Sequence, residues 1–172
     1  REFLVRSIDD QTKQIVHNAC AQYYSKLSKS SETTLEQIYH ELASEHQQEA
    51  IEKIVEFGRQ LVSQGHLELL SLIESVNVDR LDSSLMAPMM QLQGDILLML
   101  GRFEQASSIF ETASSAAKDA NLPVVYAEIL GSQADIAMKQ GQTDNALAAH
   151  KEALEVQVEL GDAKGAARTY NN

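Results

Sequence analysis

The sequence is poor in the residues that interrupt helices or cross-link small domains. Its 172 residues include two prolines, eight glycines, one cysteine and no tryptophan, and aromatic residues make up 5%. So few prolines and glycines favour long helices. The lone Cys20 excludes an intrachain disulfide, and the longest uncharged apolar run, 96–100, is far too short to cross a bilayer. We therefore expect a cytoplasmic protein in which Cys20 is a small buried side chain.

Positive charge is also scarce. The chain has 14 Lys and Arg residues against 25 Asp and Glu residues, and its net charge is −11. Binding to nucleic acid through phosphates needs clustered positive charge, and an acidic chain repels a polyanion. Since the sequence has no basic cluster, the same reasoning applies to an anionic membrane surface. We therefore expect neither a nucleic-acid partner nor a membrane partner.

What remains is a chain with 44% hydrophobic residues, and these recur with the period of a helix. The first stripe includes Ile15, Ala19, Tyr23 and Leu27, which we expect to be a packing face. Caps are predicted at Asp9 and Asp10, at the Thr33–Glu36 pair and at 82–84. The predicted helices cover about 10–28, 33–43, 47–64, 66–78, 85–100, 104–120, 123–140 and 144–160, with another beginning near Gly165.

No pattern of catalytic or metal-binding side chains stands out, although the sequence has five histidines. His40 and His46 are six residues apart, which puts them on opposite sides of a helix, and the position that would share a face with His40 holds Ser44. His17 and His150 are single histidines on predicted packing faces. No glycine-rich loop has the order that cradles phosphates. We therefore expect no catalytic residue, no metal and no cofactor.

An internal repeat is the most informative feature. A set of five positions recurs at an offset of 40 in the numbering. The first copy has Gly94, Gly101, Ala106, Phe110 and Ala113, and the second copy has Ala134, Gly141, Ala146, His150 and Ala153. A more divergent copy has Gly58 and Gly65. The first small residue of each copy lies mid-helix, where a partner helix can cross closely, and the second ends the helix in a left-handed cap.

This pattern resembles the tetratricopeptide repeat. The stretches 100–106 and 140–146 carry it most clearly, whereas His150 stands where the family has an aromatic residue. The resemblance covers 86–172 and, in a weaker form, 50–78. It implies an all-α fold, namely a right-handed α-α superhelix (a TPR-like solenoid) of about four helical hairpins and a truncated fifth.

The first fifty residues resemble a different region, the segment after the winged-helix domain of STAND signal-transduction NTPases. The resemblance rests on 15–24, with a His before Ala and paired Tyr, and on 38–43, with a Tyr-His pair. It implies that 1–8 is a tail or the end of a preceding winged-helix domain, and that 9–46 is a helical hairpin of the linker region. Residues 47–172 are then the TPR-like repeats, over about 47–78, 85–120, 123–160 and a truncated 165–172. We expect the chain to be part of a longer protein.

The resemblance implies a binding module without catalytic activity, whose partner is a protein or a peptide segment. The module would be the sensor or regulatory part of a larger STAND-type NTPase or transcriptional regulator. Residues at inward-facing positions of the repeat are the candidate partner-binding set: Arg59, Asp95, Met99, Glu128, Asp135, Lys139, Arg168 and Asn172. Two alternatives stay open, a structural or oligomerisation scaffold that associates through exposed repeat ends, and a small-ligand sensor or enzyme.

Overall fold

The protein is all-α. The structure, a computed structural model, describes residues 9–78 and 81–171, and these ranges contain helices and no strand. Within these ranges, no helix combines the length and the apolarity that a membrane span needs. The predicted tail 1–8 and the candidate residue Asn172 lie outside the described residues. The described helices are α2 (Asp10–Ser25), α3 (Ser31–Leu42), α4 (Gln47–Ser63), α5 (Leu69–Glu74), α6 (Ser83–Met99), α7 (Phe103–Asp119), α8 (Pro123–Lys139), α9 (Thr143–Glu159) and α10 (Ala163–Asn171).

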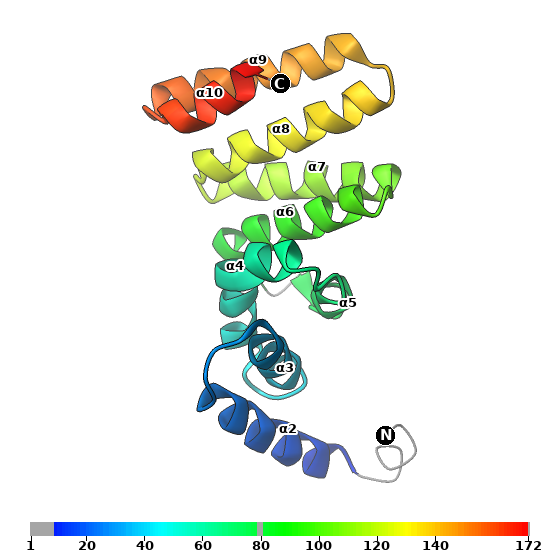
Figure 1. Cartoon of the computed structure of the whole chain (residues 1–172), viewed down its shortest axis with the longest axis vertical. Coiled ribbons are helices and arrows are strands. Elements are labelled where there is room, and N and C mark those ends of the chain that lie inside the picture. Colours follow the sequence, from blue (N-terminus) through cyan, green and yellow to red (C-terminus); the bar gives the residue numbers. More distant parts are fainter. Residues whose placement is uncertain (1–8, 79–80, 172) are drawn as a thin grey trace. The chain divides into compact units, whose positions relative to one another are not determined.

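The helices pack as two compact units that divide between Val76 and Asn77. In the first unit, α3 contacts α2, α4 and α5, and α4 also contacts α5. In the second unit, each helix from α6 to α10 contacts the next one, and α6 also contacts α8 (Figure 1). The sequence placed the start of the repeats at residue 47, whereas α4, which begins there, packs on α3 within the first unit.

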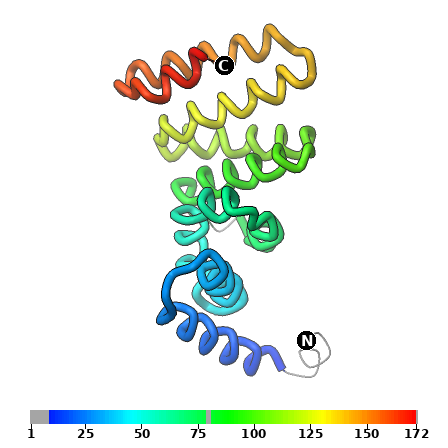
Figure 2. Tube along the Cα trace, viewed as in Figure 1, coloured from blue at the N-terminus to red at the C-terminus, as the bar shows by residue number. Residues whose placement is uncertain are grey.

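The second unit repeats its helix boundaries at the offset seen in the sequence. α6 and α8 span Ser83–Met99 and Pro123–Lys139, and α7 and α9 span Phe103–Asp119 and Thr143–Glu159, so both pairs are offset by 40. α10 begins at Ala163, which follows the start of α8 by the same offset and comes two positions before the predicted start. Figure 2 shows the chain running back and forth through these helices in sequence order. The spacing seen in the sequence is therefore the spacing of the helical hairpins.

Left-handed residues produce the turns of this unit. Gly101 and Gly141 have φ of 73° and 74°, as the predicted helix caps require. The turns after α7 and α9 use Asn121 and Gly161, with φ of 52° and 68°. These two positions are related by the repeat offset as well. The repeat is hard to recognise in the sequence at these positions, because Asn and Gly share no side-chain similarity, only a tolerance of this conformation.

Small residues let the helices of each hairpin approach closely. A Cβ added to Gly94 on α6 would lie 2.5–2.8 Å from ring atoms of Phe110 on α7, so the ring occupies the space that a larger residue would need. Phe110, Ala106 and Ala113 are buried, as are Ala146 and Ala153 at the equivalent positions of α9. The predicted close crossing is confirmed at Gly94.

Several helix ends differ from their predicted positions. α3 begins with a capping box of Ser30 and Thr33, in which each side-chain oxygen accepts a hydrogen bond from the backbone of the other residue, and not with the Thr33–Glu36 pair. The cap predicted within 82–84 is confirmed at Asp82, but α6 begins at Ser83, two positions before the predicted start, so Pro88 is its sixth residue. α5 covers only six residues of the predicted 66–78. The Ser75 hydroxyl donates a hydrogen bond to a backbone carbonyl of α5. Such side-chain bonds compete with the backbone hydrogen bonds that would continue the helix.

The apolar stripe of α2 is largely exposed, against the expectation of a packing face. Ile15 and Tyr23 are 62% and 61% exposed, and Ala21 is the buried residue of this helix. Cys20, expected to be buried, is half-buried. The reason is tertiary, because α3 is the one helix among the described residues with which α2 makes extensive contact.

Candidate functional site

The candidate site is a face formed by alternate helices of the second unit. α6 and α8 contact each other although α7 separates them in the chain. Gln91 Nε2 on α6 donates a hydrogen bond to Glu128 Oε2 on α8, at 3.0 Å. Ser132 Oγ on α8 donates to Asp95 Oδ1 on α6, at 3.1 Å. Each bond joins two residues that are 37 positions apart in the sequence. This separation is about one helical turn shorter than the repeat offset of 40, so the repeat itself brings these side chains together.

An ion pair extends this face to α10. Arg168 Nη2 lies 3.6 Å from Glu128 Oε1, while the other carboxylate oxygen of Glu128 accepts the bond from Gln91. The Glu128 side chain is 22% exposed and that of Arg168 is 61% exposed. Glu128 is thus the central member of a polar chain across α6, α8 and α10, which we call the alternate-helix ladder: Gln91, Asp95, Glu128, Ser132 and Arg168.

The structure brings together most of the residues selected from the sequence. Six of them lie on α6, α8 and α10: Asp95, Met99, Glu128, Asp135, Lys139 and Arg168. Asp135, Lys139 and Met99 are exposed, and Met99 is 63% exposed. Arg59 is exposed on α4 of the first unit, so the structure does not join it to this set.

Gln91 and Ser132 belong to this face but are not among the residues selected from the sequence. The available signal was spacing on one helix, because Glu128, Ser132 and Asp135 follow at i, i+4 and i+7 and so share one side of α8. Polar side chains on one side of a helix that is otherwise largely apolar indicate that they have hydrogen-bond partners on the neighbouring repeat.

Gly131 marks open space on α8. It lies in the helix interior next to Ser132, and a Cβ placed on it would have no atom within 4 Å. Glycine in a helix interior costs about 1 kcal/mol relative to alanine. At Gly94 close packing explains that cost, whereas at Gly131 no contact within the described residues does so. The backbone of α8 is therefore accessible here.

A second polar cluster ties α7, α8 and α9 together. The Tyr126 hydroxyl donates a hydrogen bond to Glu152 Oε1, and Lys118 Nζ lies 4.4 Å from the centre of the Tyr126 ring. Burial, followed by the bond to Glu152, raises the pKa of Tyr126, and the bond to Tyr126 raises the pKa of Lys118. Tyr126 therefore stays protonated at neutral pH, which suits a structural tie better than a nucleophile or a base.

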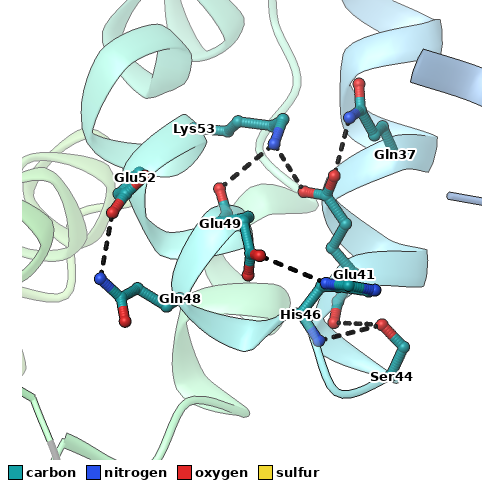
Figure 3. Close-up of polar contacts among 8 residues, drawn as sticks. All are labelled: Gln37, Glu41, Ser44, His46, Gln48, Glu49, Glu52 and Lys53. Carbon is teal, nitrogen blue, oxygen red and sulfur yellow. Dashed lines mark hydrogen bonds and ion pairs between the residues drawn. The ribbon is translucent and has the colours of Figure 1, made fainter. Parts of the chain in front are cut away.

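A third cluster surrounds the buried Glu41 in the first unit (Figure 3). Glu41 is 6% exposed, its Oε2 lies 3.0 Å from Lys53 Nζ on α4, and Gln37 Nε2 donates to its Oε1 at 2.7 Å. Ser44 Oγ donates to the Glu41 carbonyl oxygen and accepts a bond from the backbone of His46. These contacts run between α3, α4 and the loop that connects them, so the cluster joins the two helices.

Histidines do not form a metal site in the part of the chain that the structure describes, where no three His, Cys, Asp or Glu side chains converge as metal ligands. His46 precedes α4 and contacts Glu49 at 3.2 Å, whereas His40 lies within α3, so the two do not share a helix. His17 is not the isolated group that its sequence context indicates, because it lies 2.8 Å from His40.

One hollow of the described surface lies at the turn between α8 and α9, lined by exposed residues 141–145. It contains none of the candidate residues. Comparison of the chain with models of known protein families, with curated proteins and with solved structures finds no match. The candidate site therefore rests on the geometry of α6, α8 and α10.

Proposed function

We propose that the chain is a non-catalytic, TPR-like helical-repeat module that binds a protein or peptide segment on the face formed by α6, α8 and α10. The constant offset between helix boundaries supports a right-handed superhelix of hairpins, since stacked repeats bury a continuous core between neighbours. The observation that carries the proposal is the alternate-helix ladder. It sets the first helices of successive hairpins beside one another, and such helices line the concave surface of a solenoid.

The chemistry of this face fits a segment of another polypeptide. Met99 offers a flexible apolar side chain that adapts to different partners. Asp135 and Lys139 present one charge of each sign, and Gly131 leaves room for a partner's backbone to approach α8. A mixed face with an accessible backbone suits an extended peptide better than a uniformly charged polymer.

A displayed peptide library tests this function. Peptides selected on the full wild-type chain should lose at least about tenfold in affinity when Asp135→Lys and Met99→Glu are combined, a loss of about 1.4 kcal/mol. Glu155→Lys, an exposed charge reversal on α9, is the matched control and should leave binding unchanged. Peptides that bind the wild type and the double variant equally would contradict the proposed face.

We also infer that the module is the sensor or regulatory part of a larger STAND-type NTPase or transcriptional regulator. Support comes from the residues that carry the resemblance, because Tyr24 and His17 on α2 meet Tyr39 and His40 on α3. The reading frame upstream of Arg1 provides the test. It should encode an NTPase domain followed by a winged helix, and a frame without them would refute this parentage.

The alternative of an oligomerisation scaffold is favoured by one observation. Large apolar side chains are exposed on α9, at its end and on α10: Leu147, Val158, Leu160 and Tyr170. Repeat units bury such faces against a neighbour, so these residues can also serve self-association. Light scattering of the full chain and of the Val158→Glu variant separates the two proposals, since a dimer that the variant disrupts supports the scaffold.

A further inference from the structure

Two histidines form the polar part of the contact between α2 and α3. His17 Nδ1 on α2 lies 2.8 Å from His40 Nδ1 on α3. The Tyr24 ring stacks on the His40 ring, with centroids 5.7 Å apart and planes inclined by 16°, and Tyr39 meets His17 edge-on at 5.6 Å. Since Ala21 is the buried residue of α2, these rings add aromatic and polar contacts to a small apolar contact with α3.

The pair of Nδ1 atoms sets a limit on protonation. A hydrogen bond between them needs one Nδ1–H donor and one Nδ1 lone pair, so at least one ring must be neutral. With one added proton, the charged ring donates and the neutral ring accepts, so the bond persists. With two added protons, two N–H groups and two positive charges would face each other across 2.8 Å, and the contact cannot persist.

One carboxylate near the pair favours a charged ring, but its effect on the pKa of His40 is smaller than the effects of burial and of His17. On α3, the half-exposed Glu36 lies 3.8 Å from His40 Nε2 and favours the charged ring. On α2, the His17 ring opposes a charge on His40. On α4, which also packs on α3, Lys53 is paired with Glu41. The ionisable side chain of α5, which contacts α3 as well, is Glu74, and it is exposed. Burial first, and then His17, lower the pKa of His40 despite Glu36.

We propose that the His17–His40 pair is a proton-sensitive joint, which holds α2 on α3 while the pair carries at most one added proton and releases α2 when both rings are protonated. The joint is separate from the α6–α8–α10 face and does not depend on the peptide-binding function. It makes the position of α2 respond to acidification within the range in which histidine titrates.

The direction of the pH effect follows from linkage. The pKa of His40 in the docked state is lower than the value of 6.5 for a free imidazole, so the undocked state binds the proton more readily. The contribution of the joint is therefore complete above about pH 6.5, and it is lost progressively as the pH falls through the docked pKa.

Nuclear magnetic resonance of the full chain at pH 7.5 and pH 5.0 tests the joint. We expect contacts between the His17 and His40 rings at pH 7.5 and their loss at pH 5.0, while contacts between α3 and α4 persist. Protection factors of the α2 amides, corrected for the pH dependence of intrinsic exchange, should fall about tenfold for each unit by which the pKa is lowered. Ring contacts and amide protection that are unchanged at pH 5.0 would overturn the proposal.

Two variants make the test specific. His17→Asn keeps a donor and an acceptor but does not titrate, so α2 should stay docked at both pH values, and a loss of protection on acidification equal to that of the wild type would refute the joint. His46→Gln removes an exposed histidine that pairs with Glu49 outside this contact, and it should leave the wild-type response unchanged. If α2 is already undocked in the His17→Asn variant at pH 7.5, the comparison of the wild type at pH 7.5 and pH 5.0 is the test of the joint.

Discussion

Lys53 Nζ lies 3.0 Å from Oε2 of Glu41, and this ion pair joins α4 to a buried carboxylate on α3. Replacing Lys53 by methionine leaves that carboxylate buried without a cation. We expect the Lys53→Met change to destabilise the first unit by about 3 kcal/mol, because a single buried charge is costlier than a pair. Hydrogen exchange of the α3 and α4 amides in the full chain measures the loss.

Two further variants check this interpretation. Removing both charges with Glu41→Leu and Lys53→Met should recover most of the loss, since an apolar pair avoids the desolvation cost. Lys13→Met removes an exposed pair with Asp10 and should change the exchange of α3 and α4 little. A double variant as unstable as Lys53→Met alone would contradict the explanation.

Replacing glycine by alanine should have opposite effects on the stability of the second unit at Gly94 and at Gly131. Gly94→Ala forces a methyl group against the Phe110 ring and should destabilise the second unit by about 1–3 kcal/mol. Gly131→Ala meets open space and should stabilise α8 by about 1 kcal/mol. Thermal unfolding of the two variants measures the contrast. A Gly94→Ala variant that is not destabilised would contradict the packing at Gly94, and a destabilised Gly131→Ala variant would contradict the open space at Gly131.

The turn after α8 depends on a left-handed backbone. Gly141 has a φ of 74° and open space around it, so a side chain there is opposed by the backbone alone. Gly141→Ala should destabilise the second unit by about 1 kcal/mol, and Gly141→Asn by less, because Asn tolerates this conformation. Denaturant unfolding of the two variants gives the order, and equal losses would argue against a backbone origin.

Alkaline pH should weaken the tie between α8 and α9. Because burial raises the pKa of Tyr126, the unfolded chain loses this proton first, and the contribution of the tie is complete below a pH of about 10 and falls above it. The melting temperature of the wild type should therefore drop more steeply between about pH 9 and about pH 11 than that of Tyr126→Phe. Tyr23→Phe removes an exposed hydroxyl and serves as the control, with the wild-type slope.

The sequence determined the helices and the period of the second unit. The offset between Gly101 and Gly141 predicted where α6 and α8 end, because glycine adopts the left-handed cap at little cost. Most of the candidate face was predictable for the same reason, since a repeat places equivalent positions on equivalent helices. The predicted caps at Asp9 and Asp82 are confirmed. The Thr33–Glu36 pair is wrong, because Ser30 and Thr33 compete with neighbours of similar capping ability.

Only the tertiary structure decided which polar and apolar side chains meet. The stripe of Ile15 and Tyr23 predicts burial, but the number of helices in contact with α2 determines how much of it is covered. The Gln91–Glu128 bond and the His17–His40 pair join residues 37 and 23 positions apart, on helices whose approach depends on the packing of others. A local pattern specifies a helix and its faces, whereas the partner of each face is set by the packing of the whole unit.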